Sequence, residues 1–166
     1  MKRVAVILAI VLTLSALGST AYAAQDSLPG DALYPVKLGV ERMAMMFRGG
    51  DVARAEQALN FADKRVREMV TLTEMGRSED LNFTVEKYCY ALNMSLARME
   101  EAVGEGGSHA GDIAALMAEI MVQHLSILDG LYGVVPAEAK PAIARAMEQA
   151  QKCYQRAIQV RQQMGP

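Results

Sequence analysis

The sequence lacks the residue patterns around which most catalytic sites are built. Its 166 residues include no Trp, two Cys and two His. It has no Gly-x-Ser-x-Gly elbow, no phosphate-cradling glycine loop and no Cys-x-x-Cys pair. The adjacent acids Glu79-Asp80 and Glu100-Glu101 point in different directions on a helix, so they do not form an acid/base pair. We therefore predict that the protein is not an enzyme and has no catalytic residue and no cofactor.

Strands and a basic surface are also missing. No segment shows sustained alternation of apolar and polar residues with β-branched enrichment, so no strand is predicted. The formal net charge is −2, and removal of residues 1–23 would make it −4, because that segment holds Lys2 and Arg3 and no acid. A mildly acidic chain is a poor binder of nucleic acid, which calls for a basic face. Mixed charges such as Asp63-Lys64-Arg65 are interpreted as a solvated helix surface.

The N-terminus has the three parts of a secretory signal peptide. Met1–Arg3 is positively charged, Val4–Leu17 is an apolar run, and Ala21-Tyr22-Ala23 has small residues at the spacing of a signal peptidase site. Cleavage between Ala23 and Ala24 is predicted, which would make the protein periplasmic, extracellular or otherwise associated with the cell envelope. The alternative is an uncleaved anchor, since about 20 uncharged residues can span a bilayer. A membrane is therefore a partner only if the leader is retained.

Three segments follow from this pattern: a signal peptide (1–23), an ordered N-terminal opener (24–34) and a helical bundle domain (35–166). The 143 residues left after cleavage suffice for one domain with a core. In the opener, Pro29-Gly30 predicts a turn, and Asp31 is placed to cap backbone N–H groups. Pro35 is the expected first helical residue.

Helical periodicity dominates the rest of the chain. Glycines and prolines divide it into five predicted helices: 35–48, 51–75, 78–103, 112–131 and 136–164. Asp51 is the expected N-cap of the second helix, and Pro136 is expected to open the fifth, with a bend at Pro141. Short connections favour antiparallel neighbours. We therefore predict an all-α fold, an up-and-down helical bundle of four longer helices plus a short N-terminal helix.

Each predicted helix has an apolar stripe that can pack. In the first helix the stripe is Val36, Val40, Met43 and Phe47. In the fifth it consists mostly of small side chains that would let a neighbouring backbone come close: Ala139, Ile143, Ala146, Ala150, Cys153, Ala157 and Val160. Burial of a large aliphatic side chain contributes about 1.5–3 kcal/mol, so these stripes can hold the fold without a metal.

The opener also carries a resemblance. Its motif residues are Leu28, Pro29, Gly30, Asp31, Leu33, Tyr34, Pro35, Lys37 and Glu41. This segment resembles the signature of an exported bacterial domain family of unknown function, number 5667. The likeness continues through Arg54-Ala55, Leu59, Ala62, Arg65 and Glu68, with a looser similarity from His124 to Ala150. The resemblance implies an extracytoplasmic helical domain, in some relatives attached to membrane-anchored regulators of the anti-sigma kind. It implies no reaction.

Cys89 and Cys153 form a candidate disulfide. Both lie on predicted inward faces, near the middle of the third and fifth helices, which run the same way in an up-and-down bundle. An exported protein with two cysteines suggests a bridge. Buried free cysteine is also a common small core residue, so both interpretations stay open.

The histidines and methionines are interpreted as structural, and no metal site is predicted. Neither His-x-x-x-His nor Glu-x-x-His spacing occurs, and His124 lies within an apolar stripe, as expected for a core histidine bonded to another helix. Met43, Met45 and Met46 are expected to fill gaps in a core. The alternative is a Cu(I) site, because thioethers are soft ligands.

Two classes of function agree with these observations. The first is a non-enzymatic protein-interaction or regulatory module of the cell envelope, with an unidentified protein partner. The second is an exported ligand-, metal- or stress-responsive binding bundle of the periplasmic chaperone or sensor kind. An exposed apolar patch favours the first class, and a closed pocket with convergent polar groups favours the second.

Overall fold

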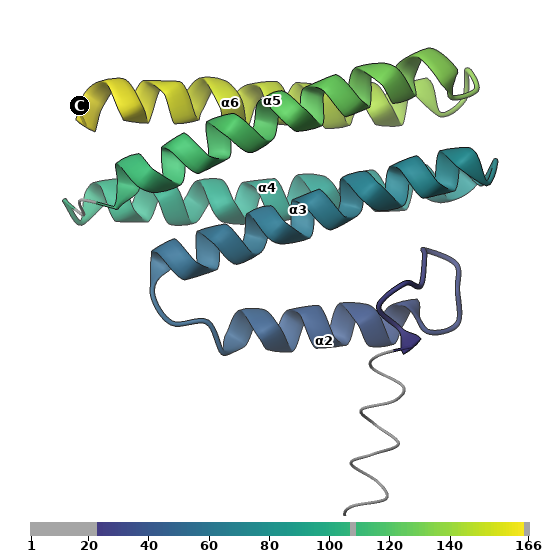
Figure 1. Ribbon diagram of the computed structural model, residues 1–166, viewed down its shortest axis with the longest axis horizontal. Coiled ribbons are helices and arrows are strands. Elements are labelled where there is room, and N and C mark those ends of the chain that lie inside the picture. Colours follow the sequence, from purple (N-terminus) through teal and green to yellow (C-terminus); the bar gives the residue numbers. More distant parts are fainter. Residues whose placement is uncertain (1–22, 107–108, 165–166) are drawn as a thin grey trace, which may run out of the picture. The chain divides into compact units, whose positions relative to one another are not determined.

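The computed structural model describes residues 23–106 and 109–164. The predicted signal peptide, apart from Ala23, lies outside the described residues. The described chain forms five α-helices, α2 (Tyr34–Met46), α3 (Asp51–Glu74), α4 (Leu81–Gly104), α5 (Ala110–Val134) and α6 (Lys140–Met164), with a short 3₁₀ helix, η1 (Ser78–Asp80), between α3 and α4 (Figure 1). The predicted all-α fold is confirmed. The chain divides into two compact units, of which the first ends at Met46 and the second begins at Phe47.

The second unit is a four-helix bundle. Short connections alternate the helix directions, so α3 and α5 run one way and α4 and α6 run the other (Figure 1). Contacts join α3 to α4, α4 to α6, α6 to α5 and α5 to α3. The order around the bundle is therefore α3, α4, α6, α5. Although α4 and α5 follow each other in the chain, they lie across the diagonal of the bundle.

The predicted stripes form the core of this bundle. The predicted inward side chains from Ala139 to Val160 are all buried, and the α3 side chains at helical spacing are buried as well: Ala55, Leu59, Ala62, Val66 and Met69. Because α6 presents mainly alanines to its neighbours, close contact between helix backbones takes the place of large interlocking side chains.

Both ends of α3 show how local sequence sets helix boundaries. Gly76 has φ 70° and follows the last residues of the helix. The N–H of Gly76 donates to Thr73 O at 3.1 Å, and that of Arg77 donates to Leu72 O at 2.8 Å, which completes a Schellman motif. The prediction for Asp51 was wrong. Asp51 is the first helical residue rather than the cap, and its carboxylate lies 3.4 Å from Arg98 Nη1 on α4.

The start of the last helix also differs from the prediction. Pro136 does not open it, because a turn intervenes in which Ala139 N–H donates to Pro136 O at 3.0 Å. The helix begins at Lys140, and Pro141 is its second residue. A proline is tolerated in the first helical turn, where its missing N–H has no intrahelical partner and its ring meets no preceding carbonyl. Pro141 therefore marks the start of α6 instead of a bend within it.

The described part of the first unit consists of the opener and α2. The predicted Pro29-Gly30 turn is present, with Gly30 at φ 87°. Asp31 Oδ2 accepts a hydrogen bond from the backbone N–H of Leu28 at 2.7 Å, a group that belongs to the turn before the helix. The helix begins at Tyr34, one residue before the expected Pro35. The opener is thus an ordered turn.

Candidate functional site

The apolar stripe of α2 faces solvent. Val36, Val40, Met43 and Met46 are 36%, 40%, 57% and 74% exposed, and Phe47, directly after the helix, is 83% exposed. The prediction that this stripe packs into a core was therefore wrong. Met43 and Met46 do not fill core gaps either. An apolar surface at helical spacing, with its side chains in water, is the kind of surface that a partner covers.

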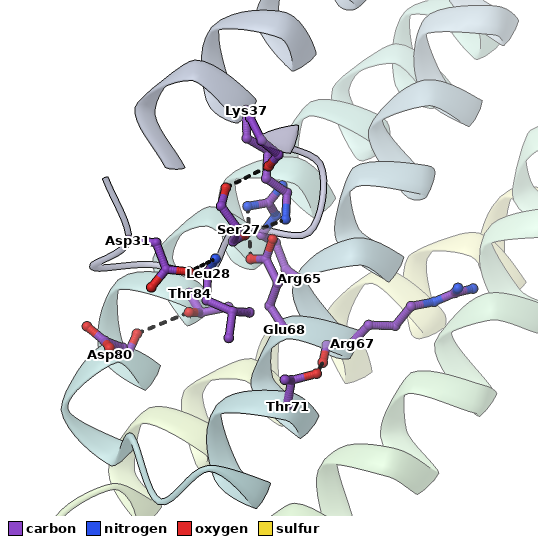
Figure 2. Close-up of polar contacts among 11 residues, drawn as sticks. Ser27, Leu28, Asp31, Lys37, Arg65, Arg67, Glu68, Thr71, Asp80 and Thr84 are labelled. Atoms are coloured by element: carbon purple, nitrogen blue, oxygen red, sulfur yellow. Dashed lines mark hydrogen bonds and ion pairs between the residues drawn. The ribbon is translucent and has the colours of Figure 1, made fainter. Parts of the chain in front are cut away.

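The opposite face of α2 carries the buried residues. Tyr34 and Lys37 are 4% and 8% exposed. Lys37 Nζ donates to Ser27 O at 2.9 Å and lies 5.6 Å from the centroid of the Tyr34 ring (Figure 2). The opener thus folds back onto the polar side of its own helix. These contacts lie on the side of α2 that is buried, while Val36 and Val40 on the other side are exposed.

The family-motif residues mostly serve this turn. Leu28, Pro29, Tyr34 and Lys37 are buried, Leu33 and Glu41 are half-buried, and Gly30, Asp31 and Pro35 are exposed. Ser27, which the sequence analysis did not single out, reinforces the turn, because its Oγ donates to Ala24 O at 2.6 Å. The motif therefore specifies a structure rather than a set of reactive groups.

A second candidate is a polar cluster in the core of the bundle, made of Asp63 on α3, Tyr88 on α4 and His124 on α5. Tyr88 and His124 are 0% and 1% exposed, and Tyr88 Oη lies 3.2 Å from His124 Nδ1 across the diagonal of the bundle. His124 Nε2 lies 3.6 Å from Asp63 Oδ1. Asp63 is half-exposed and pairs with Arg67 at 2.8 Å on the surface. The expectation of a hydrogen-bonded core histidine is confirmed.

Burial shapes the ionisation of this cluster. It raises the pKa of Tyr88, with a further contribution from the Cys153 and Cys89 thiols, so the phenol keeps its proton. Burial lowers the pKa of His124, and the Asp63 carboxylate partly opposes this effect. A neutral His124 that accepts from Tyr88 at Nδ1 carries its proton on Nε2, where it points at the carboxylate. The opposite tautomer would turn a lone pair toward Asp63.

The two cysteines lie beside this cluster, on helices that are parallel and in contact. Cys153 is buried and Cys89 is half-buried. Burial, with a smaller contribution from the nearby Cys89, raises the pKa of Cys153 to about 11. The hydrogen bond that Gln149 Nε2 donates to Cys153 Sγ at 3.6 Å acts in the opposite direction and lowers this pKa. Burial also raises the pKa of Cys89. The candidate disulfide between them stays a prediction.

Residues 26–164 match the model of a protein family described as Domain of unknown function (DUF5667). The chain belongs to this family. The resemblance carried by the opener is therefore confirmed, and the match extends through the whole bundle. No curated protein matches the chain. No solved structure matches it either.

One feature of this DUF5667 domain was missed by sequence reasoning. Arg65 and Glu68 on α3 are 1% and 4% exposed, and Arg65 Nη1 lies 2.9 Å from Glu68 Oε2 (Figure 2). Arg65 had been assigned to a solvated surface, which was wrong. The sequence pattern that could have identified this pair is an arginine and a glutamate three residues apart, both within the family signature. Residues at this spacing share one helix face, so the two side chains can be buried together.

Two further properties of the DUF5667 domain concern metals and membranes. Within residues 23–106 and 109–164, no group of three or more His, Cys, Asp or Glu side chains is arranged to hold a metal ion. In the same residues, one helix, α5, is long and apolar enough to cross a membrane by length and composition, and 39% of its apolar window is buried inside the protein. Core helices of helical bundles share this composition.

Proposed function

We propose that this domain is a non-enzymatic protein-interaction module of the cell envelope, acting outside the cytoplasm. The observation that carries the proposal is the exposed stripe of α2. Val36, Val40 and Met43 recur at intervals of four and three residues, the spacing at which one helix presents anchors to another. Since the opener holds α2 by its opposite face, the stripe is available without unfolding the first unit.

The occupant of the stripe is an amphipathic helix of a partner protein. Methionine has three rotatable bonds and a polarizable sulfur, so it adapts to a partner surface. The charged side chain of α2 that is exposed is Arg42, while Lys37 is buried and Glu41 is half-buried. A complementary helix therefore carries acidic side chains beside its own apolar stripe.

Two supporting observations concern the chemistry and the location. Two side chains suited to acid–base work, Tyr88 and His124, are 0% and 1% exposed, which favours a role in the core over a role in a reaction. The leader pattern from Met1 to Ala23 favours export. A regulatory role for the family, implied by the resemblance, agrees with a domain that binds through a surface.

The experiment is site-specific photo-crosslinking in intact cells. A benzophenone amino acid at position 43 is expected to capture a defined segment of a different protein, and sequencing of the crosslinked peptide should show an amphipathic helix with acidic residues. The same probe at Val122, a 56% exposed position on α5, is the matched control and should not capture that segment. A Val40→Glu variant should abolish the crosslink, and Arg42→Glu should weaken it.

Other outcomes contradict the proposal. Crosslinks from position 43 to a second copy of this chain, or to phospholipid, would assign the stripe to self-association or to a membrane surface. Capture of the same segment from positions 43 and 122 would show non-specific contact. Absence of any crosslink from position 43 in cells that contain the full envelope would mean that the stripe has no protein partner.

A further inference from the structure

The core polar cluster joins three helices at one point. Asp63, Tyr88 and His124 come from α3, α4 and α5, and the Tyr88–His124 contact is the one described above across the diagonal. The imidazole and phenol rings are tilted, with centroids 5.6 Å apart. Within the described residues, His124 Nε2 has no hydrogen-bond partner, and the Asp63 carboxylate lies just beyond hydrogen-bond distance at 3.6 Å.

Titratable groups on three other helices act on His124 or on its partner Tyr88. From α3 come Asp63 and, paired to it at the surface, Arg67. From α4 comes Tyr88, with Cys89 beside it, and from α6 comes Cys153, which acts on Tyr88. The cluster therefore holds one neutral base, one phenol and one carboxylate that also pairs with Arg67, and two thiols lie beside it.

We propose that this cluster is a proton-sensitive lock on the packing of α5 against α3 and α4, closed while His124 is neutral and released when His124 takes up a proton. The proposal is independent of the surface on α2.

The geometry explains why a proton opens the lock. Protonation places N–H donors on both nitrogens of His124, so Tyr88 can no longer donate to Nδ1 and must turn its own hydrogen elsewhere in the core. The cation at Nε2 gains attraction to Asp63, but that carboxylate already pairs with Arg67. A buried cation then remains with one shared counter-charge, whereas in an opened state water solvates it.

The direction of the pH effect follows from linkage. The pKa of His124 is lowered in the folded protein, by burial first. An opened state, with a pKa near 6.5, therefore binds the proton more readily, and the closed state is fully favoured only above that value. As the pH falls below about 6.5, the population of the opened state should rise by up to about tenfold per pH unit, until the folded pKa is reached.

The experiment is native-state hydrogen exchange of the full chain, read at amides of α4 and α5 around Tyr88 and His124. After correction for intrinsic exchange rates, protection should fall by up to about tenfold from about pH 6.5 to about pH 5.5. A His124→Gln variant, which cannot titrate there, should show flat protection over this range. A His109→Gln variant is the matched control, since His109 is exposed, and it should keep the wild-type profile.

Three results would overturn the proposal: flat protection in the wild type, an unchanged pH profile in His124→Gln, or loss of the profile in His109→Gln. If His124→Gln does not fold, nuclear magnetic resonance of the imidazole nitrogens in the wild-type protein decides the question. The neutral ring should be protonated at Nε2, and its protonation should coincide with the loss of protection. Titration of His124 at or above 6.5 with protection intact would exclude a lock.

Discussion

Loss of the Glu68 charge should destabilise the protein by about 3 kcal/mol. Arg65 and Glu68 meet at 2.9 Å with side chains 2% and 5% exposed. Glu68→Gln keeps the shape of the side chain but leaves the buried Arg65 guanidinium without this counter-charge. Removal of one partner from a buried ion pair typically costs about 3–5 kcal/mol, and we expect the lower end because glutamine still offers an acceptor oxygen.

The same helix supplies a control for the effect of burial. Arg67 Nη2 and Asp63 Oδ2 meet at 2.8 Å, nearly the same distance, but their side chains are 79% and 39% exposed. Arg67→Gln should therefore lower the free energy of unfolding by less than about 0.5 kcal/mol, as is usual for solvated pairs on a helix. The two ion pairs have nearly the same length and differ in how much water surrounds their charges.

Urea unfolding followed by far-ultraviolet circular dichroism measures the loss in the free energy of unfolding for Glu68→Gln and for Arg67→Gln. An equal dependence on urea concentration shows that unfolding exposes the same amount of surface in each variant. A third variant, Arg65→Met with Glu68→Leu, should recover most of the stability, because apolar side chains then replace both members of the buried ion pair. Similar losses for Glu68→Gln and Arg67→Gln would refute the reasoning, as would a double variant no more stable than Glu68→Gln.

Further predictions follow from single positions. Gly130→Ala on α5 should raise the free energy of unfolding by about 0.5–1 kcal/mol, because an added Cβ meets nothing within 4 Å and alanine favours the helix. Gly76→Ala should lower it by about 1 kcal/mol, because its φ of 70° is strained for alanine; thermal melts that rank the two variants the other way would contradict both. In reduced native protein a maleimide should label the half-buried Cys89 before the buried Cys153, whose pKa is raised to about 11, and mass spectrometry of early time points checks the order. Lys37→Ala should speed proteolysis of residues 24–34, because it removes the bond to Ser27 O, and an unchanged rate would mean that the bond does not hold the opener.

Much of the fold was predictable because helical periodicity is a local property. The inward stripe of α6, from Ile143 to Val160, could be identified residue by residue, since side chains three and four apart share one face. The Gly76 stop was predictable for a similar reason, because a positive φ after a helix favours glycine. Alternating helix directions followed from the short connections.

The remaining features depend on contacts between distant residues. Periodicity identifies the stripe of Val36, Val40 and Met43 on α2, but it does not say which face the opener covers. That choice is made by the bond from Lys37 to Ser27 O, ten residues back. Likewise, sequence predicted a hydrogen-bonded His124 but not its partner Tyr88, since the order of helices around the bundle is a tertiary property.

The contact between Tyr88 and His124 also sets the axial alignment of the helices when the bundle assembles. Alanine-lined helices could slide past one another by one turn, 5.4 Å, and still bury much of their apolar surface. Such a shift would separate the Tyr88 phenol from the His124 imidazole and leave both polar groups in the apolar core without this hydrogen bond. A single buried hydrogen bond can thus select one axial alignment among several that the apolar helix surfaces alone would allow.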